Sequence, residues 1–187
     1  MILSVKNMVC PRCVDAVSSI LNEMNLDAES VELGEIVLTR KVKSDQLKEL
    51  ENRLEMKGFE LVLDRESEIT VQIKTTLIHY LNHLEKEKNP KKISVFLSSQ
   101  LNYNYSYLSN LFSVHEKITI ESFFIRLKVE RVKELLSYKK WTLSEIAWKL
   151  KYSSVQYLSN QFKKITGQTV TEYLNNPQSK RIPLDQL

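Results

Sequence analysis

The sequence predicts an α+β protein, in which a small βαββαβ domain is followed by an all-α domain, and three observations support this prediction. Strand-like and helix-like patterns alternate through residues 1–64, whereas apolar residues at helical spacing dominate from residue 69 onward. The chain has only 3 Gly and 4 Pro, which argues against a turn-rich all-β fold. The segment Tyr107–Asn110 recurs as Tyr157–Asn160, so the helical part contains an internal repeat.

The N-terminal part is predicted from alternating apolar runs, helical spacing and turn residues. Its expected elements are a strand at Ile2–Lys6, a helix from Pro11 to about Asn25, a hairpin at Ser30–Thr39 that turns at Gly34–Glu35, a helix capped by Ser44 or Asp45, and a strand at Phe59–Leu63. This order in residues 1–64 predicts a ferredoxin-like sandwich.

The C-terminal part reads as helices after a charged linker at residues 64–68. A helix starts at Ile69, and further helices are expected at 93–101, 105–114, 120–137, 143–150, 154–164 and 169–175. The predicted domains are therefore 1–64 and 69–175, with a polar tail at 176–187.

The two predicted parts of the chain also differ in net charge. Residues 1–64 carry 8 Lys/Arg against 12 Asp/Glu, whereas residues 65–187 carry 19 against 11. A basic second part fits a nucleic-acid partner, and a solvated basic surface is the simpler alternative. No apolar run is long enough for a membrane span and no secretory signal is apparent, so we expect a cytoplasmic protein with no membrane partner. No catalytic set is apparent, and we expect no enzyme activity.

Cys10 and Cys13 are the only cysteines, at CxxC spacing where the first helix begins. The helix N-terminus and Arg12 both favour thiolates. Two sulfurs without an adjacent His suit a linear or trigonal Cu(I) site, or another soft metal ion, better than a closed Zn site. A thiol–disulfide pair and a purely structural domain remain alternatives. Met8 is expected to pack under the loop.

The motif Met8-x-Cys10-x-x-Cys13 on the first loop of a βαββαβ unit resembles the heavy-metal-associated domain of copper chaperones and metal-transporting ATPases. The resemblance covers residues 1–64 and implies metal binding by the two cysteines. The chain departs from that family at Asn7, where a Gly is usual, and at Pro11 and Arg12, where small residues are usual. His79 and His83, four apart on a helix, have the spacing of a Zn pair but read as an incidental polar face.

The second repeat has the pattern of a helix-turn-helix. Thr142 caps a helix in which Ala147 allows a close helix approach, Lys151 lies in the turn, and Ser153 or Ser154 caps the next helix. Leu158 and Phe162 would face inward. The outward residues would then be Gln156, Tyr157, Ser159, Asn160 and Lys163, and Lys163 and Lys164 would suit phosphates.

The segments 130–136 and 142–167, with Tyr173, resemble the DNA-binding domain of the AraC family of transcription regulators. The resemblance covers about residues 69–175 and implies two recognition helices separated by a joining helix. By position, base-reading side chains would be Ser106, Ser109 and Asn110 in the first copy and Gln156, Tyr157 and Asn160 in the second, with Lys163 and Lys164 on phosphates.

Two departures from that family concern the turn and the first copy. Lys151 stands where Gly is usual, which predicts backbone strain. The basic residues and Gly that follow the family's first recognition helix are replaced by the segment Ser113–Lys117. The first copy should therefore contribute fewer phosphate contacts, and a helical bundle without a DNA ligand is the structural alternative.

Together these patterns predict a sequence-specific DNA-binding transcription regulator that responds to a soft metal ion at the CxxC motif. The expected partner is double-stranded DNA, bound by a monomer or a homodimer. One mechanism would have the acidic first part dock on the basic second part and mask it. The alternative function is a metal-handling or thiol-redox module whose helical half binds a protein partner.

Overall fold

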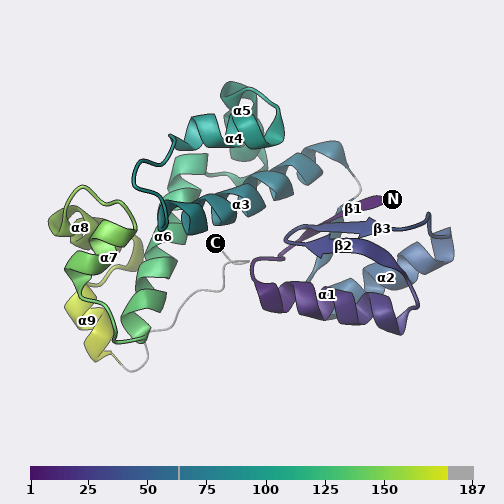
Figure 1. Cartoon of the computed structure of the whole chain (residues 1–187), viewed down its shortest axis with the longest axis horizontal. Helices are drawn as coiled ribbons and strands as arrows, with labels where there is room; N and C mark the ends of the chain where they lie inside the picture. The colour runs from purple at the N-terminus through teal and green to yellow at the C-terminus, as the bar shows by residue number, and fades with distance from the viewer. Residues whose placement is uncertain (63, 177–187) are drawn as a thin grey trace.

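The computed structural model describes residues 1–62 and 64–176, and these form a sheet-bearing part and a helical part (Figure 1). The strands are β1 Ile2–Lys6, β2 Ala28–Glu32, β3 Glu35–Leu38 and β4 Glu60–Val62. The helices are α1 Pro11–Glu23, α2 Ser44–Met56, α3 Arg65–Leu84, α4 Ile93–Leu101, α5 Tyr105–Glu116, α6 Ile120–Ser137, α7 Leu143–Lys149, α8 Val155–Thr166 and α9 Val170–Asn175. Leu63 of the expected last strand and residues 177–187 of the expected tail lie outside the described residues.

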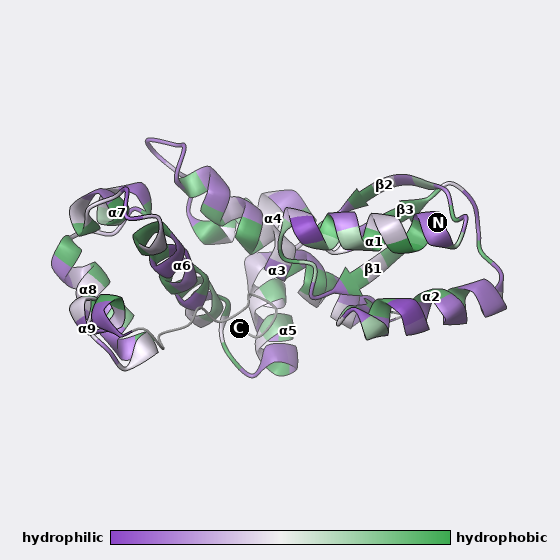
Figure 2. Cartoon of the chain, turned by 90° about the horizontal axis from the view of Figure 1, so that it is seen from below, coloured by the Kyte–Doolittle hydropathy of each residue, from purple (hydrophilic) through white to green (hydrophobic). Residues whose placement is uncertain are grey.

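The sheet is antiparallel in the order β2-β3-β1-β4, which confirms the predicted βαββαβ fold. In the register, Leu3 lies opposite Ile36 and Val5 lies opposite Leu61. These inward-facing residues form a core with apolar residues of α1 and α2, such as Leu50. In Figure 2, α2 is largely hydrophilic outside its buried residues.

Two local details of this part differ from the sequence prediction. The N-cap of α2 is Lys43, whose backbone N–H donates to the side-chain oxygen of Gln46 at 3.2 Å, so the expected caps Ser44 and Asp45 are instead the first residues of the helix. The hairpin turns at Leu33–Gly34, one residue earlier than expected, and Gly34 has a φ of +80°. Gly supplies this left-handed conformation at little steric cost.

The expected linker at residues 64–68 is wrong, because α3 already begins at Arg65. The carboxylate of Asp64 caps the helix by accepting the backbone N–H of Ser67 at 2.8 Å. Glu66 and Glu68 then lie in the first turn, where negative charge interacts favourably with the helix dipole. The acidic run is therefore a helix start, and β4 leads almost directly into the helical part.

The helical part has two three-helix units, one on either side of α6. Its helices lie at the positions that the sequence predicts, so the predicted succession of helices is confirmed. α3, α4 and α5 form the first unit, and α7, α8 and α9 form the second. Phe112, Phe123 and Phe162 are fully buried in the shared core of this part. In both views the second unit and the sheet lie at opposite ends of the molecule (Figures 1 and 2).

Candidate nucleic-acid interface and thiol site

The second helix-turn-helix unit is built by α7 and α8. Thr142 caps α7 through a reciprocal capping box with Glu145, and the hydroxyl of Ser154 caps α8 by accepting the backbone N–H of Tyr157 at 3.0 Å. Ala147 is buried where the two helices meet, as its small size predicts. Leu158 and Phe162 anchor α8 in the core, so the orientation of its outer face is fixed.

The outer face of α8 carries the residues that the sequence predicts to read DNA. Gln156, Tyr157, Asn160, Lys163 and Lys164 are all exposed. The amide of Gln156 donates to the side-chain oxygen of Asn160 at 3.0 Å, so these two side chains lie together on neighbouring turns. Exposed amide side chains of this kind can pair with adenine edges in the major groove.

The turn of this unit holds Lys151 in the left-handed conformation, with a φ of 52°. This finding agrees with the strain expected for a non-Gly residue at this position. The ammonium of Lys151 lies 4.8 Å from the ring centroid of the exposed Trp148, which gives the strained residue a cation–π contact. Asn102 occupies the equivalent turn of the first unit with a φ of 57°.

The first unit presents less charge on its recognition helix α5. Ser106 and Asn110 are exposed and Ser109 is half-buried, while Leu108 and Phe112 anchor the helix. At the end of this helix, Glu116 forms an ion pair with Lys74 of α3 at 2.6 Å. The end of α5 is therefore held against α3 and offers few groups for phosphates.

Helix α6 lies between the two units, and two of its lysine side chains, Lys128 and Lys133, make charged contacts there. Glu130 and Lys133 form a buried ion pair at 2.5 Å. The ammonium of Lys128 lies 3.6 Å from the ring centroid of Tyr152, the residue that follows the second turn. Burial lowers the pKa of Lys128 from 10.5 to about 8. The Lys128–Tyr152 contact joins α6 to the second unit, whereas the Glu130–Lys133 pair lies within α6, and no local sequence pattern indicates the Lys128–Tyr152 pair.

The CxxC loop joins β1 to α1. Asn7 has a φ of 70° and its side-chain amide donates to the carbonyl oxygen of Gly58 at 2.8 Å, which explains why a residue that tolerates the left-handed region stands there. Met8 is 1% exposed in the core, so it packs under the loop as predicted. Cys10 is the N-cap of α1 and Pro11 occupies its first turn.

The two thiols lie side by side at the start of α1. Their sulfur atoms are 3.4 Å apart, and both residues are half-buried. Burial raises the pKa of the Cys13 thiol, and this effect outweighs the backbone N–H groups near the helix N-terminus that would lower it. Arg12, which was expected to favour a thiolate, is exposed.

The thiols of Cys10 and Cys13 fit a soft metal ion that needs few protein ligands. Within residues 1–62 and 64–176, no group of three His, Cys, Asp or Glu side chains could hold a metal ion. His83 forms an ion pair with Glu87 at 2.9 Å, whereas His79 lines a cleft that the thiols also line. Cys10 and Cys13 are thus the residues that could hold Cu(I), and the site does not fit a closed tetrahedral Zn centre.

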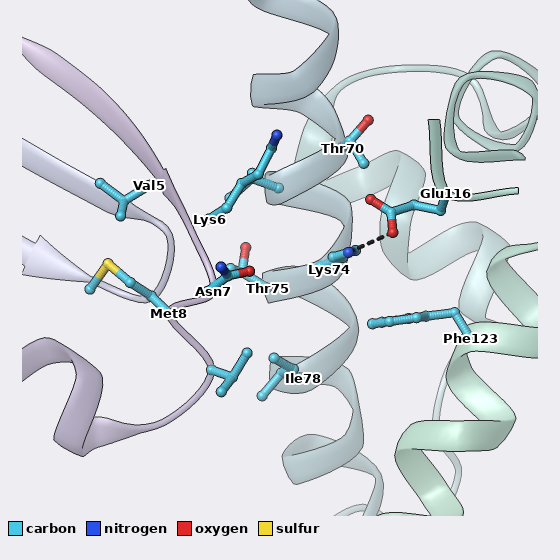
Figure 3. A pocket seen from close by; sticks show the side chains of 12 residues that line it. Val5, Lys6, Asn7, Met8, Thr70, Lys74, Thr75, Ile78, Glu116 and Phe123 are labelled. Atoms are coloured by element: carbon cyan, nitrogen blue, oxygen red, sulfur yellow. Dashed lines mark ion pairs between the residues drawn. The ribbon is translucent and has the colours of Figure 1, made fainter. Parts of the chain in front are cut away.

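The CxxC loop also contacts the helical part, which the sequence did not indicate. Val9 and Leu33 are half-buried against the core of the helical part. Beside them, residues 5–9, α3 and Phe123 of α6 enclose a cavity of about 30 Å³, which the Lys74–Glu116 ion pair borders (Figure 3). The apolar Val9, placed between the buried Met8 and Cys10, is the one sequence feature that could have suggested this contact.

Gly34 of the hairpin turn packs closely against helix α3. A Cβ atom added there would lie 2.7 Å from Cγ2 of Thr75 and 2.8 Å from Cγ1 of Val71, both on α3. The sheet-bearing part therefore meets the first helix-turn-helix unit through α3. It does not cover α8, whose predicted reading residues stay exposed at the far end of the molecule, so this conformation is not the masked one that charge asymmetry suggested.

With this geometry in place, a family model described as a helix-turn-helix domain matches residues 97–176, from within α4 to the end of α9. Searches of curated proteins and of solved structures gave no significant match. The match covers the end of α4, then α5, α6 and the whole second unit, and it shows that these residues form an AraC-type helix-turn-helix domain, the DNA-binding unit of a class of transcription regulators. A domain of this class binds DNA and is typically not catalytic. No described helix is both long enough and apolar enough to cross a membrane.

Proposed function

We propose that this protein is a sequence-specific transcription regulator whose DNA binding responds to a soft metal ion held by Cys10 and Cys13. The observation that carries the proposal is the exposed face of α8, in a domain matched as a helix-turn-helix. Gln156, Tyr157 and Asn160 would contact bases, and Lys163 and Lys164 would contact phosphates. Ser106, Ser109 and Asn110 would make a weaker second set of contacts on α5.

The metal would act through the contact between the CxxC loop and α3. A ligand shifts a conformational equilibrium only when it binds the two states with different affinity. Val9 packs on the helical core directly before Cys10, so a change in the loop on metal binding would alter a contact with the DNA-binding part. We expect Cu(I) to be the preferred ion, with Zn(II) bound less tightly. Cys10 and Cys13 would hold the ion through their thiolates, and the ion would supply a soft Lewis acid at the start of α1.

The test uses the full chain to select DNA fragments from a genomic library, followed by affinity measurements on the selected site. We expect the protein to bind that site at least a thousandfold more tightly than unrelated DNA. The double variant Gln156→Ala/Asn160→Ala should lose most of this preference but keep non-specific binding. Equal affinity for the selected and unrelated DNA would reject the function.

Metal control is tested on the same site. Cu(I) should change the affinity of the full chain for the selected DNA, and Zn(II) should do so less. The variant Cys10→Ser/Cys13→Ser should bind the DNA without responding to either ion. A response that survives in this variant would remove the CxxC motif from the proposal. A DNA-binding regulator works in the compartment that holds the DNA, which supports the expected cytoplasmic location. Because one chain contains two helix-turn-helix units, either a monomer or a homodimer could bind DNA.

Thiol redox is the second candidate, and the 3.4 Å separation of the sulfurs favours it. The sulfurs would need to approach to about 2.05 Å, with two protons released and two electrons passed to an oxidant such as a small disulfide. Oxidation of the metal-free protein should then change DNA affinity reversibly. If thiol titration shows a disulfide but DNA affinity is unaltered, redox control is excluded.

A further inference from the structure

An open cleft of about 1220 Å³ lies beside the two thiols, between the sheet-bearing part and the helical part. Cys10 and Cys13 line one side of it. The opposite side comes from α3 and α6, with apolar groups that include Ile78, Leu81 and Leu127. The thiols are thus the reactive end of a large, partly apolar cleft.

The spacing of the sulfurs limits which atom can bridge them without moving them. For bonds of about 2.3 Å, the length of a typical metal–sulfur bond, sulfurs 3.4 Å apart subtend an angle of about 95°. A linear arrangement would require them to be about 4.6 Å apart. The observed spacing therefore suits an element that forms bonds near a right angle, as trivalent main-group elements do.

The third bond of such an atom cannot come from the described part of the chain, which holds no three-ligand cluster. Arg131, the cation on the far wall of the cleft, is already paired with Glu85 at 2.6 Å and with Glu134 at 2.9 Å. The cleft therefore does not present this cation to an anionic ligand. Its apolar wall instead favours a ligand whose third substituent is an organic group.

We propose that the thiol pair and this cleft together bind trivalent organoarsenicals, in which arsenic carries one carbon substituent. The inference rests on the proposed function, because it takes the CxxC motif as the effector site and names the class of effector. In the binding step, R–As=O reacts with both thiols to give R–As(S–Cys)₂ and one water molecule. Two As–S bonds replace the As=O bond, both thiol protons leave in the water, and arsenic stays trivalent, so no oxidant is needed.

The test is a competition in which the reduced full chain and free dithiothreitol compete for phenylarsine oxide or for arsenite. Competition corrects for the affinity that any dithiol has for each reagent. Native mass spectrometry then gives the fraction of protein in a one-to-one adduct. We expect the protein to prefer the phenyl reagent over arsenite by at least tenfold relative to dithiothreitol, and we expect adduct formation to require both cysteines.

A matched pair of variants separates the cleft from the thiols. His79 lines the cleft and is exposed, whereas His83, four residues later on α3, is exposed outside it. His79→Trp should remove the phenyl preference without reducing arsenite binding, and His83→Trp should keep the preference. The inference is overturned if phenylarsine oxide and arsenite compete equally, or if the preference persists in His79→Trp.

The same samples distinguish this inference from the proposed function. DNA affinity is measured with and without Cu(I) and with and without phenylarsine oxide. If Cu(I) alters DNA affinity but the phenyl preference is absent, the organoarsenical site is rejected and metal control stands. If the cleft-dependent phenyl adduct forms but DNA affinity responds to neither reagent, the ligand site stands and control of DNA binding by the CxxC motif is rejected.

Discussion

Lys117 and Gly167 end the two recognition helices at equivalent positions of the repeat, and both hold the left-handed conformation, with φ values of 60° and 76°. Each donates its backbone N–H to the corresponding carbonyl oxygen, that of Ser113 at 3.1 Å and that of Lys163 at 2.8 Å. The two helix ends therefore have the same geometry, although only one of them has the residue that adopts it freely.

This difference predicts that Lys117→Gly stabilises the protein. Relief of the left-handed strain should exceed the added entropy of the unfolded chain, for a net gain of about 0.5–1 kcal/mol in the free energy of unfolding. Urea denaturation at pH 7 measures the gain. The reciprocal control is Gly167→Ala, which should lose about 1 kcal/mol. A loss of stability in Lys117→Gly would show that the hydrogen bond from its ammonium to the carbonyl oxygen of Val114 matters more than the strain.

Gly34→Ala should weaken the contact between the hairpin and α3. The new methyl group would meet Thr75 and Val71 at less than 3 Å, and the backbone would be strained as well. We expect a loss of roughly 2–4 kcal/mol in the free energy of unfolding. Gly58→Ala is the matched control, because Gly58 has a φ of +82° and nothing lies within 4 Å of an added Cβ. It should lose only about 1 kcal/mol, and equal losses in the two variants would contradict the close contact.

Because of Lys128, the free energy of unfolding should rise as pH increases. Burial lowers its pKa from 10.5 to about 8, so between these values the unfolded chain binds more protons than the folded protein does. The destabilisation is complete below pH 8 and disappears as pH rises toward 10.5. The cation–π contact with Tyr152 offsets part of the burial effect, which leaves a rise of roughly 1–2 kcal/mol.

The measurement compares wild-type protein with Lys128→Met by urea denaturation from pH 7 to pH 10.5. Subtracting the two curves cancels the contribution of groups that do not contact Lys128. The stability of the wild-type protein relative to Lys128→Met should rise steadily above pH 8. A constant difference across the range would mean that Lys128 keeps its ordinary pKa.

Lys163→Ala should lower DNA affinity for all sequences alike, if α8 binds DNA as proposed. Loss of one phosphate contact reduces the slope of log affinity against log salt by about 0.9. Filter binding or fluorescence anisotropy at several salt concentrations measures this slope. Ser113→Ala, at the equivalent position of the first unit, is the control and should leave the slope unchanged. A similar change in both variants would refute the predicted asymmetry between the two units.

The helical part could be predicted closely because its signals are local. The hydroxyls of Thr142 and Ser154 cap the helices that follow them, and the spacing of Leu158 and Phe162 identifies the buried face. The strain at Lys151 was predicted from its place in the turn and agrees with its positive φ. Which exposed residues contact DNA stays a prediction.

The features that the sequence did not predict depend on contacts between distant segments, or on a local pattern that fits two different structures. Asp64 and the acidic residues after it fit a charged linker and a capped helix equally well, and only the structure distinguishes the two. Val9 gives no periodic signal that it packs on the helical core. The cleft beside Cys10 exists because α3 and α6 lie across from the loop, and this relationship is tertiary.

Because α3 begins at Arg65, directly after the sheet, one helix supports both the hairpin turn at Gly34 and the first DNA-binding unit. The two parts therefore cannot be exchanged like independent modules. A chimera that gives this DNA-binding domain another sensor would need a sensor surface shaped to Val71 and Thr75. For the same reason, we expect residues 34, 71 and 75 to have changed together during the evolution of this architecture.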